Sequence, residues 1–522
     1  MKKTFVKRII LTVLMTIFLV STASAAPVKL KNLPSTTDLG ETDFDPLVDI
    51  AVTVEIQKIR SLGKFDHQLH VIEKIDWFSD PDFYVKVFIN DEEFTSTVWH
   101  NTKYIYDPQW SITLDVPDDE EFVNIKIQLW DWNIGMDRLC DISSDFDGFI
   151  DSFDIELIYS IKTGHWMGDD FIDPETTSVD PSGYGRLNGC DDGSIYQRDR
   201  DCELWFDIYQ NDLDGDGIPY WTEVNIYGTN PEVGNTGEDA DDDGVPIEWE
   251  HKWGHYFWYN WQDDKYEHEW FYSPFEWNDH ANLDPDQDGI DNVEEYLTSQ
   301  WGSDPFRKDL FIELDQMDES PTGEKSILPE GSKELLQTAY DRQNIVYHLD
   351  DGGMGGSDMI PFDEETPREE LMEIYWKYFL HEDENNWRRG VFHYGLVVYD
   401  GTWAGFAFWG GVGPYLDSFQ ISSSKVGKGV RNPLNKDIAY ASVYMHETGH
   451  TLGIFHGNTP GCDDQEGKAI WQKNWWKWGP YKSTMNYRYV YFMVDYSDGS
   501  RGKNDWDDWN RIDLTFFQRS MW

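Results

Sequence analysis

Three histidines near the C-terminus are spaced like the ligands of a single metal ion. They belong to the segment HETGHTLGIFH, which begins at His446 and ends at His456. The preceding residues DIAYASVYM are compatible with a helix, on which the side chains of His446 and His450 project from the same face. Gly453 can adopt a positive φ and end this helix, so that the chain turns and His456 reaches the same ion. The spacing therefore predicts a zinc site with three histidine ligands.

Glu447, directly after the first histidine, supplies the other group that such a site needs. Three protein ligands leave a fourth position for water, which distinguishes a catalytic zinc from a structural one. The carboxylate of Glu447 would lie beside this water, where it can take a proton and later pass it to a leaving amine. We therefore expect peptide-bond hydrolysis with Glu447 as the general base and without a covalent intermediate.

The motif HExxHxxGxxH resembles that of the metzincin superfamily of zinc endopeptidases, and every defining position is present. Metzincins have a methionine turn beneath the zinc, and the resemblance assigns this role to Met485 in KSTMNYRY. Tyr487 matches the position at which astacin-like and serralysin-like members place a tyrosine near the zinc; the alternative is a packed aromatic residue. The Met-Asn-Tyr turn is similar to that of pappalysins and related microbial enzymes. GTWAGFAFWG resembles the edge strand on which metzincins align an extended substrate.

Three acidic segments fit the twelve-position pattern D-x-D-x-D-G-[IV]-x-x-x-x-E of a calcium-binding loop. The first three aspartates supply carboxylates, the glycine makes a sharp turn, the residue after it offers a backbone carbonyl and the final glutamate closes the site. The predicted ligands are Asp212, Asp214, Asp216, Ile218 and Glu223 in the first loop, Asp239, Asp241, Asp243, Val245 and Glu250 in the second, and Asp284, Asp286, Asp288, Ile290 and Glu295 in the third.

The surroundings of these loops resemble thrombospondin type 3 and related bacterial calcium repeats rather than a paired EF-hand. The first loop is followed by IYGTNP, and long flanking helices are not evident. Proline after the hydrophobic position of the first two loops also disfavours the exit helix of an EF-hand. The resemblance implies that Ca²⁺ cancels repulsion and stiffens a spacer between domains. The alternative is a solvated acidic linker.

Short alternating segments between residues 46 and 211 predict an antiparallel β-sandwich, for example FYVKVFI, WSITLDV, VNIKIQLW and FDIELIYSI. IDWFSDPDFYVKVFI and IKIQLWDWNIGMDRLCDIS resemble the calcium loops of the phospholipid-binding domains of protein kinase C and synaptotagmin. The calcium ligands that this resemblance implies are Asp76, Asp80 or Asp82, with Asp131 and Asp137. Asn133 departs from the family, which usually has aspartate there. Solvation of the loops is the alternative role of these carboxylates.

After Gly302-Ser303-Asp304-Pro305 the pattern changes to mixed strands and helices. The expected strands are DLFIELDQM, NIVYHL and FHYGLVVYD, and the expected helices surround GSKELLQTAYDRQ and TPREELMEIYWKYFL. This indicates an α/β domain. Because this domain contains the zinc motif, it resembles a metzincin protease domain. Few contacts are expected across the boundary near residue 306. The expected organisation is a signal peptide at 1–25, a linker at 26–45, the β-sandwich at 46–211, a calcium-repeat region at 212–305 and the protease domain at 306–522.

The chain of 522 residues has a formal net charge of -56, with 42 Lys and Arg against 98 Asp and Glu. This excludes a nucleic-acid-binding protein that is held by phosphate contacts. So large an excess of one sign opposes compaction, and either multivalent cations or the salt of a saline habitat must offset it. Calcium is the first candidate. Acidity confined to the metal loops would favour calcium over salt.

The N-terminus has the parts of a secretory signal peptide: basic MKKTFVKR, an apolar run at 9–20 and small residues at 23–25. The apolar run is shorter than the roughly 20 residues that span a bilayer. We therefore expect a secreted, extracellular protein. We also expect it to be a monomer. In that oxidising setting Cys190 and Cys202 are expected to form a disulfide, and Cys140 and Cys462 are free or paired.

The expected function is that of a secreted, calcium-stabilised zinc endopeptidase that acts on proteins or peptides. Its sandwich is expected to make calcium-dependent contact with a surface or lipid, and nucleic acid is not an expected partner. The alternative is a calcium-dependent extracellular adhesion protein with a vestigial protease domain, whose tryptophans bind carbohydrate or protein. The presence of all three histidines and of Glu447 favours the enzyme.

Overall fold

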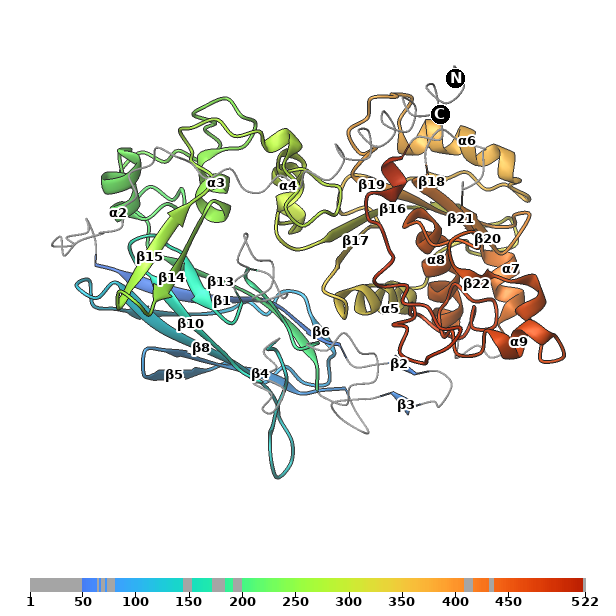
Figure 1. Ribbon diagram of the computed structural model, residues 1–522, viewed down its shortest axis with the longest axis horizontal. Coiled ribbons are helices and arrows are strands. Elements are labelled where there is room, and N and C mark those ends of the chain that lie inside the picture. The colour runs from blue at the N-terminus through green and yellow to red at the C-terminus, as the bar shows by residue number, and fades with distance from the viewer. Residues whose placement is uncertain are drawn as a thin grey trace, which may run out of the picture.

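The structure is a computed structural model that describes residues 49–519 except 63–64, 67–70, 73–79, 144–152, 171–183, 191–199, 408–415 and 431–435. Figure 1 shows a β-sandwich and a region built on a mixed sheet with helices, with short helices between them. The multidomain organisation with these two fold types is as predicted. The expected signal peptide and linker lie outside the described residues. Among the described helices, none has both the length and the apolar character that crossing a membrane requires.

The sandwich consists of two antiparallel sheets. One has the order β12-β13-β1-β6 with β7 also paired to β1, and the other has the order β11-β10-β8-β4-β5 with β9 paired to β8. The first contains β1 (Ala51–Ser61), β6 (Tyr104–Ile105), β7 (Trp110–Asp115), β12 (Arg186–Asn188) and β13 (Cys202–Gln210). The second contains β4 (Phe83–Ile89), β5 (Glu92–Thr95), β8 (Phe122–Asp131), β9 (Arg138–Leu139), β10 (Ile155–Ser160) and β11 (Trp166–Gly168). β2 (Phe65–Asp66) and β3 (Val71–Ile72) form a separate two-stranded sheet.

Alternation of apolar and polar residues accounts for these strands. In β8 every second side chain from Val123 to Leu129 is buried in the core, and the side chains between them are not. Period-two burial is what a strand with one face on a core requires. β1 pairs with β13 and β7, with an irregular register between Ile56 and Lys58. The predicted antiparallel β-sandwich is confirmed.

Short helices follow each acidic loop. They are α2 (Tyr220–Thr222) and η1 (Glu223–Tyr227), α3 (Ile247–Trp253), and α4 (Asn292–Thr298) with η3 (Ser299–Trp301). β14 (His255–Asn260) and β15 (Lys265–Trp270) form a hairpin, and η2 (His280–Asn282) precedes the third loop. Pro219 and Pro246 directly precede α2 and α3. A proline at a helix start loses no helical hydrogen bond, so it limits where these helices begin without preventing them.

The acidic-loop region packs partly against each neighbour. Val245 of the second loop, with Trp249 and Trp253 of α3, belongs to the core of the sandwich. Ile290 of the third loop belongs instead to a core cluster of the C-terminal sheet that includes Phe311. The second loop is thereby joined to the sandwich and the third to the C-terminal region.

The C-terminal sheet has the order β17-β16-β19-β21-β20, with β18 paired to β16, and only β20 is antiparallel to its neighbour. Its strands are β16 (Asp309–Met317), β17 (Val346–Asp350), β18 (Met359–Ile360), β19 (Phe392–Val398), β20 (Gly405–Ala407) and β21 (Ser418–Ser422). The other elements are α5 (Glu330–Asp341), η4 (Arg368–Glu370), α6 (Leu371–Ile374), η5 (Tyr375–Phe379), α7 (Ser423–Gly429), α8 (Lys436–Thr451), β22 (Pro460–Asp463), η7 (Gln465–Gly467), α9 (Lys473–Lys477) and η8 (Phe516–Gln518). α5 and α8 cover one face, and α6 with the following η5 covers the other; Figure 1 labels α5, α8 and α6.

Buried ion pairs cross the boundary near residue 306. The guanidinium of Arg60, on β1, contacts the carboxylates of Glu203 on β13 and of Asp341 on α5. Arg342 pairs with Asp201 at 3.2 Å in the same junction. The prediction that few contacts cross this boundary is therefore wrong. A turn-rich sequence marks a change of composition, but it carries no information about surfaces that are far apart in the chain.

The predicted disulfide between Cys190 and Cys202 is also wrong. All four cysteines lie among the described residues, and all are free. Cys202 begins β13 and turns its thiol into the core beside that of Cys140. Sγ of Cys190 lies 3.5 Å from Oδ2 of Asp201. Because consecutive residues of an extended chain face opposite sides, a thiol beside Asp201 is turned away from Cys202.

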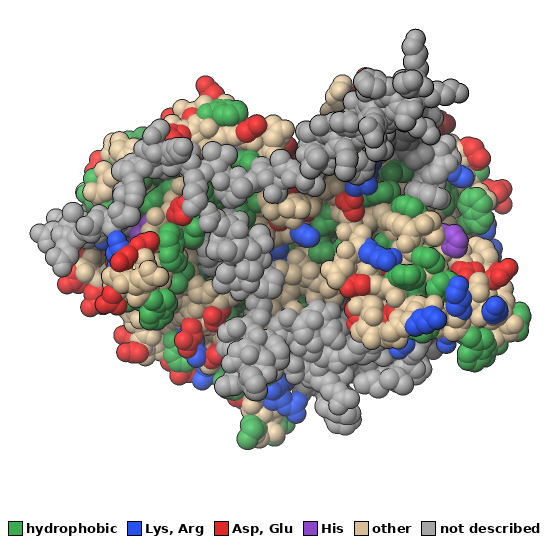
Figure 2. Space-filling model, viewed as in Figure 1, with side chains coloured by type: hydrophobic (Ala, Val, Ile, Leu, Met, Phe, Trp, Pro, Cys, Tyr) green, Lys and Arg blue, Asp and Glu red, His purple; other side chains and the backbone are tan. Residues whose placement is uncertain are grey.

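Acidic side chains are not confined to the loops. Figure 2 shows Asp and Glu over both the sandwich side and the C-terminal side of one face. Exposed examples outside the loops are Asp91, Glu92 and Glu93 in the sandwich and Glu382, Asp383 and Glu384 in the C-terminal region. Calcium bound at the loops would therefore offset only part of the charge, and the saline-habitat explanation stays open for the rest.

Candidate metal centres

Backbone carbonyl groups fix one ring nitrogen of each of the three histidines. α8 carries His446 and His450, whose ring centroids lie 4.9 Å apart. A carbonyl oxygen only accepts, so an Nδ1 bonded to it carries the proton, and Nε2 of the neutral ring offers a lone pair. This arrangement orients histidines that ligate metals. The acceptors of His446, His450 and His456 are, in order, the carbonyls of Thr484 at 2.8 Å, Ile454 at 2.7 Å and Cys462 at 2.9 Å.

The turn after α8 brings the third histidine to the same cavity as the first two. α8 ends at Thr451, and Gly453 has a φ of +85°, which glycine adopts without strain. The predicted helix end at this glycine is confirmed. Beyond the turn, His456 lines the cavity that His446 and His450 also line.

The carboxylate of Asp463, which the motif does not include, faces two of these histidines. Oδ1 lies 3.1 Å from Nε2 of His446, and Oδ2 lies 3.5 Å from Nε2 of His450. Burial alone would raise the pKa of Asp463, but the two imidazoles hold it well below its usual value. The three side chains can together hold a metal ion, and imidazole with carboxylate suits zinc. The spacing of the histidines gives no signal for this residue.

Glu447 is buried in the wall of the same cavity, and burial raises its pKa. Gly405 of the edge strand β20 lies directly against it: a Cβ atom at Gly405 would fall 2.4 Å from Oε1 of Glu447. Any side chain there would displace the carboxylate, so glycine is required for this close approach. Sequence spacing gives no sign of the contact, although the resemblance to metzincins assigned Gly405 to the edge strand.

Met485 and Tyr487 both adjoin the histidine group. Met485 is fully buried against α8, where a Cβ atom at Gly449 would fall 2.5 Å from its sulfur. The ring of Tyr487 stacks on His446, with centroids 5.6 Å apart and an interplanar angle of 21°. Burial and the neighbouring carboxylate of Asp463 raise the pKa of Tyr487. The structure thus brings both predicted residues next to the predicted ligands.

The cavity beside these residues has a volume of about 990 Å³. β20 borders it and is the last strand of the sheet among the described residues. An edge strand presents unpaired backbone groups with which an extended peptide can pair. Trp403, Phe406 and Trp475 add aromatic surface to the cavity wall. The part of GTWAGFAFWG from residue 408 onwards lies outside the described residues.

All three acidic loops bring their first three aspartates together, with oxygens within 4.8 Å of one another. The loop glycine has a positive φ, and its N–H donates to the first aspartate; the N–H of the next residue donates to the third aspartate. The glycine bonds are Gly217 to Asp212 (2.8 Å), Gly244 to Asp239 (3.0 Å) and Gly289 to Asp284 (3.1 Å). Those of the next residue are Ile218 to Asp216 (2.9 Å), Val245 to Asp243 (3.4 Å) and Ile290 to Asp288 (2.8 Å).

The closing glutamates are buried with oxygens that lack partners. Glu250 and Glu295 are each 1% exposed, and in the described chain none of their carboxylate oxygens has a hydrogen-bond partner. Burial, followed by the loop aspartates, raises the pKa of Glu250 to about 10. In the first loop Thr229 donates to one oxygen of Glu223, and the other has no partner among the described residues. Buried, uncompensated carboxylates are costly, so these oxygens mark places that a cation can fill.

The third loop is bonded to the C-terminal sheet. The N–H of Asp309, the first residue of β16, donates to Oδ2 of Asp288 at 2.7 Å. The side chain of Gln518, on η8, donates to the carbonyl of Gly289 at 2.5 Å. A cation bound in this loop would therefore stabilise the start of β16 as well as the loop itself.

The aspartates predicted at one end of the sandwich meet, but the protein itself already binds them. Asp131 accepts from the N–H of Asp82 at 3.0 Å and from Nδ2 of Asn133 at 2.6 Å. Asp137 accepts from the N–H of Asn133 and from the hydroxyl of Tyr84, both at 3.0 Å. Asn133, where the resemblance expects aspartate, thus bridges the two carboxylates.

The hairpin between β8 and β9 exposes apolar side chains at its tip. Ile134 is 95% exposed and Met136 is 81% exposed, between the two aspartates that Asn133 bridges. Asp80 lies 3.7 Å from Lys103, and Asp76 lies outside the described residues. Exposed apolar side chains in one short segment are typical of a contact surface.

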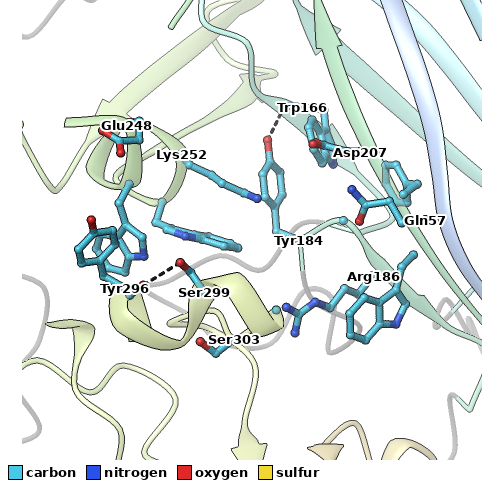
Figure 3. A pocket seen from close by; sticks show the side chains of 16 residues that line it. Gln57, Trp166, Tyr184, Arg186, Asp207, Glu248, Lys252, Tyr296, Ser299 and Ser303 are labelled. Carbon is cyan, nitrogen blue, oxygen red and sulfur yellow. Dashed lines mark hydrogen bonds between the residues drawn. The ribbon is translucent and has the colours of Figure 1, made fainter. Parts of the chain in front are cut away.

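A second cavity, of about 390 Å³, lies where the sandwich meets α3 and α4 (Figure 3). Trp166, Tyr184 and Trp205 line it from the sandwich, and the backbone N–H of Trp166 donates to the hydroxyl of Tyr184. Arg186 stacks over Trp205 at 4.6 Å and pairs with Asp304 at 3.1 Å. These contacts hold the lining side chains in place at the junction of the two regions.

No model of a known protein family matches this chain, and no curated protein sequence matches it. Among solved structures it is similar to human GIVD cytosolic phospholipase A2 in complex with methyl gamma-linolenyl fluorophosphonate (13% identity, TM-score 0.18), over 31% of this chain and 17% of that one. It is also similar to a C2 domain of plant extended synaptotagmin 1 (12%, 0.19), over 31% and 95% of the two chains. A third similar structure is a C2 domain protein from Ramazzottius varieornatus (12%, 0.18; 31% and 88%). The chain thus spans less than a fifth of the phospholipase.

Proposed function

We propose that this chain is a secreted, calcium-stabilised zinc endopeptidase. One observation carries the proposal: three imidazoles, each fixed by a backbone carbonyl at Nδ1, line one cavity with the buried carboxylate of Glu447. The residues that would hold zinc are His446, His450 and His456, because rings fixed in this way present Nε2 to a metal. A bound zinc ion would activate water and polarise the scissile carbonyl.

In this proposal Glu447 is the general base. Its carboxylate takes a proton from the attacking water and later delivers it to the leaving amine. The burial that raises its pKa favours this exchange, because a carboxylate in an apolar wall holds a proton more readily than an exposed one. Tyr487 would donate a hydrogen bond to the developing oxyanion. β20 would align an extended peptide by backbone pairing, so that proteins or peptides are the substrates.

The proposal extends to the fold of the C-terminal region. The supporting features are parallel strands bordered by one antiparallel edge strand, a helix that carries the first two histidines, and a buried methionine against that helix. On this basis we propose that residues 306–522 form a metzincin-like protease domain. We also propose that the protein acts outside the cell as a monomer.

Calcium at the three acidic loops is the second part of the proposal. Each loop has converging aspartates and a buried glutamate with at least one oxygen that lacks a partner in the described chain. The ion would have a structural role, because the second loop packs on the sandwich and the third is bonded to β16.

A calcium-dependent contact with a lipid surface is the candidate function of the sandwich. The exposed tip at Ile134 and Met136, beside two aspartates, supports it. The same surface would serve the alternative function of an adhesion protein with a vestigial protease domain. Co-sedimentation with anionic vesicles, with and without Ca²⁺, tests it: Ile134→Ser with Met136→Ser should abolish binding, whereas Val233→Ser, an exposed apolar residue elsewhere, should not.

Zinc content and cleavage of a denatured protein, measured on the same samples, test the peptidase. Glu447→Ala should keep zinc and lose cleavage by about 10²–10⁴-fold. His450→Ala should lose zinc as well. Glu466→Ala, an exposed acid on η7, is the matched control and should change neither. Undiminished cleavage by Glu447→Ala would overturn the mechanism, and stoichiometric zinc in His450→Ala would overturn the ligand assignment.

A further inference from the structure

Asp463 points its carboxylate at His446 and His450, in the cavity that His456 also lines, and the inference drawn from it rests on the proposed zinc site. Its oxygens lie 3.1 Å from Nε2 of His446 and 3.5 Å from Nε2 of His450. Ligands about 2.0–2.1 Å from one tetrahedral zinc ion lie about 3.3 Å from each other. The two distances are therefore those expected between ligands of one ion.

The atoms that face each other here have the same electronic character. Because Nδ1 of His446 and of His450 donates to a carbonyl, Nε2 of the neutral ring carries a lone pair, as do both oxygens of Asp463. Two lone pairs at this distance repel unless a positive ion or proton lies between them. Apart from Nε2 of His446, the buried Oδ1 of Asp463 has no hydrogen-bond partner in the described chain. Either a proton on a ring Nε2, which is how the imidazoles lower the pKa of Asp463, or a cation shared by the three side chains removes the conflict.

The backbone holds Asp463 in this orientation. Its φ of +54° lies in the left-handed region, which residues other than glycine adopt at a cost. Its N–H donates to the carbonyl of Met485 at 3.2 Å, and the carbonyl of the preceding Cys462 accepts from Nδ1 of His456. The residue is thus anchored to the methionine turn on one side and to the third histidine on the other. Such anchoring maintains a strained conformation that aims the carboxylate at Nε2 of His446 and of His450.

We propose that Asp463 is the fourth protein ligand of zinc in the resting protein and occupies the position of the catalytic water. Four protein ligands close a zinc site, which is the arrangement of a structural and not of a catalytic ion. Asp463 must therefore leave the ion before Glu447 can act. The resting protein is therefore partly latent: only the fraction of molecules in which Asp463 has left the ion cleaves substrate, and the chain itself supplies the blocking group.

Zinc affinity and the visible spectrum of the cobalt(II)-substituted full chain test this proposal. Asp463→Asn removes the charge but keeps the shape of the side chain and its tolerance of a positive φ. We expect zinc affinity to fall by at least about 10–100-fold, the cobalt spectrum to change, and cleavage at saturating zinc to rise. Asp464→Asn is the matched control, because that carboxylate accepts from Asn474 and Trp478, both at 2.7 Å, and should behave as wild type in zinc binding.

The outcomes separate this proposal from the proposed function. A folded Asp463→Asn variant with wild-type zinc affinity and cobalt spectrum would refute the ligand assignment and leave the endopeptidase standing. A zinc-loaded variant that cleaves no faster than wild type would refute the latency. Failure of the wild-type chain to bind zinc would overturn both proposals. If Asp463→Asn does not fold, Asp463→Gly, which suits a positive φ, takes its place in the same measurements.

Discussion

The histidine group and the acidic loops hold their donor atoms in different ways. In the histidine group, carbonyls of the surrounding fold fix Nδ1 of every ring. In the acidic loops, N–H groups of the loop fix the aspartates, but Glu250 and Glu295 stay buried with unpartnered oxygens in the described chain. A neutral imidazole is buried at modest cost, whereas an uncompensated carboxylate is not. We infer that the fold itself orients the three rings, among which Asp463 alone needs a positive ion or a proton, and that cations complete the loops.

Removal of calcium should have the largest effect that this difference predicts. Selective chelation with zinc retained is expected to lower the free energy of unfolding by about 3–4 kcal/mol for each site that was filled at 100–1,000 times its Kd. Urea titrations at constant, modest ionic strength measure it. Amide exchange should increase in the loops at 212–223, 239–250 and 284–295.

Removal of zinc is the matching control. Because backbone carbonyls already fix the rings, the amides of α8 should keep most of their protection when zinc is absent. If zinc chelation increased amide exchange in α8 as much as calcium chelation does in the loops, the inferred difference between the two kinds of site would be wrong. Unchanged stability after calcium removal would leave the saline habitat as the explanation of the charge.

Gly405→Ala tests how precisely the fold alone positions the carboxylate of Glu447 beside the histidines. The new methyl group would fall 2.4 Å from Oε1 of Glu447, so the carboxylate must move. A displacement of about 1 Å in an active site costs about 10²-fold, and we expect kcat/KM to fall by that factor with zinc retained. Gly353→Ala is the control, because no atom lies within 4 Å of the added methyl group. Wild-type kcat/KM in Gly405→Ala would show that β20 can move away from Glu447 without loss of activity.

Met485→Leu should have the smallest effect. The carbonyl of Thr484, and not the sulfur of its neighbour, fixes His446, so a side chain of similar volume should suffice. We expect a loss of less than about 1.5 kcal/mol in the free energy of unfolding, with zinc content unchanged. Thermal unfolding and zinc analysis of the same sample measure both. Loss of zinc would mean that the sulfur, and not the turn, positions the ligand.

Local rules explain what could be predicted from the sequence. β4 and β16 match their predicted segments because an apolar strand is recognisable within its own residues. The helical face of His446 and His450 and the turn at Gly453 follow from spacing and from the freedom of glycine. The loop aspartates converge because each loop makes its own hydrogen bonds.

Contacts between distant segments account for what could not be predicted. Asp463 reaches the histidines only because its backbone bonds to the methionine turn. The need for glycine at Gly405 depends on how closely β20 approaches α8. The thiol of Cys202 turns to Cys140 because of strand geometry, although Cys190 is nearer in the chain. None of these contacts produces a periodic pattern or a fixed spacing in the sequence, so they could not be predicted from it.

The ion pair between Arg60 and Asp341 has a consequence for how the chain is made. The two residues are 281 positions apart. At roughly 5–20 residues per second, a ribosome adds Asp341 about 15–60 s after Arg60. Glu203, the other buried partner of Arg60, is itself added 143 positions after Arg60, and a buried charged group that lacks one member is strongly destabilised. We therefore expect the first strand of the sandwich to reach its full stability only after α5 of the C-terminal region has been synthesised.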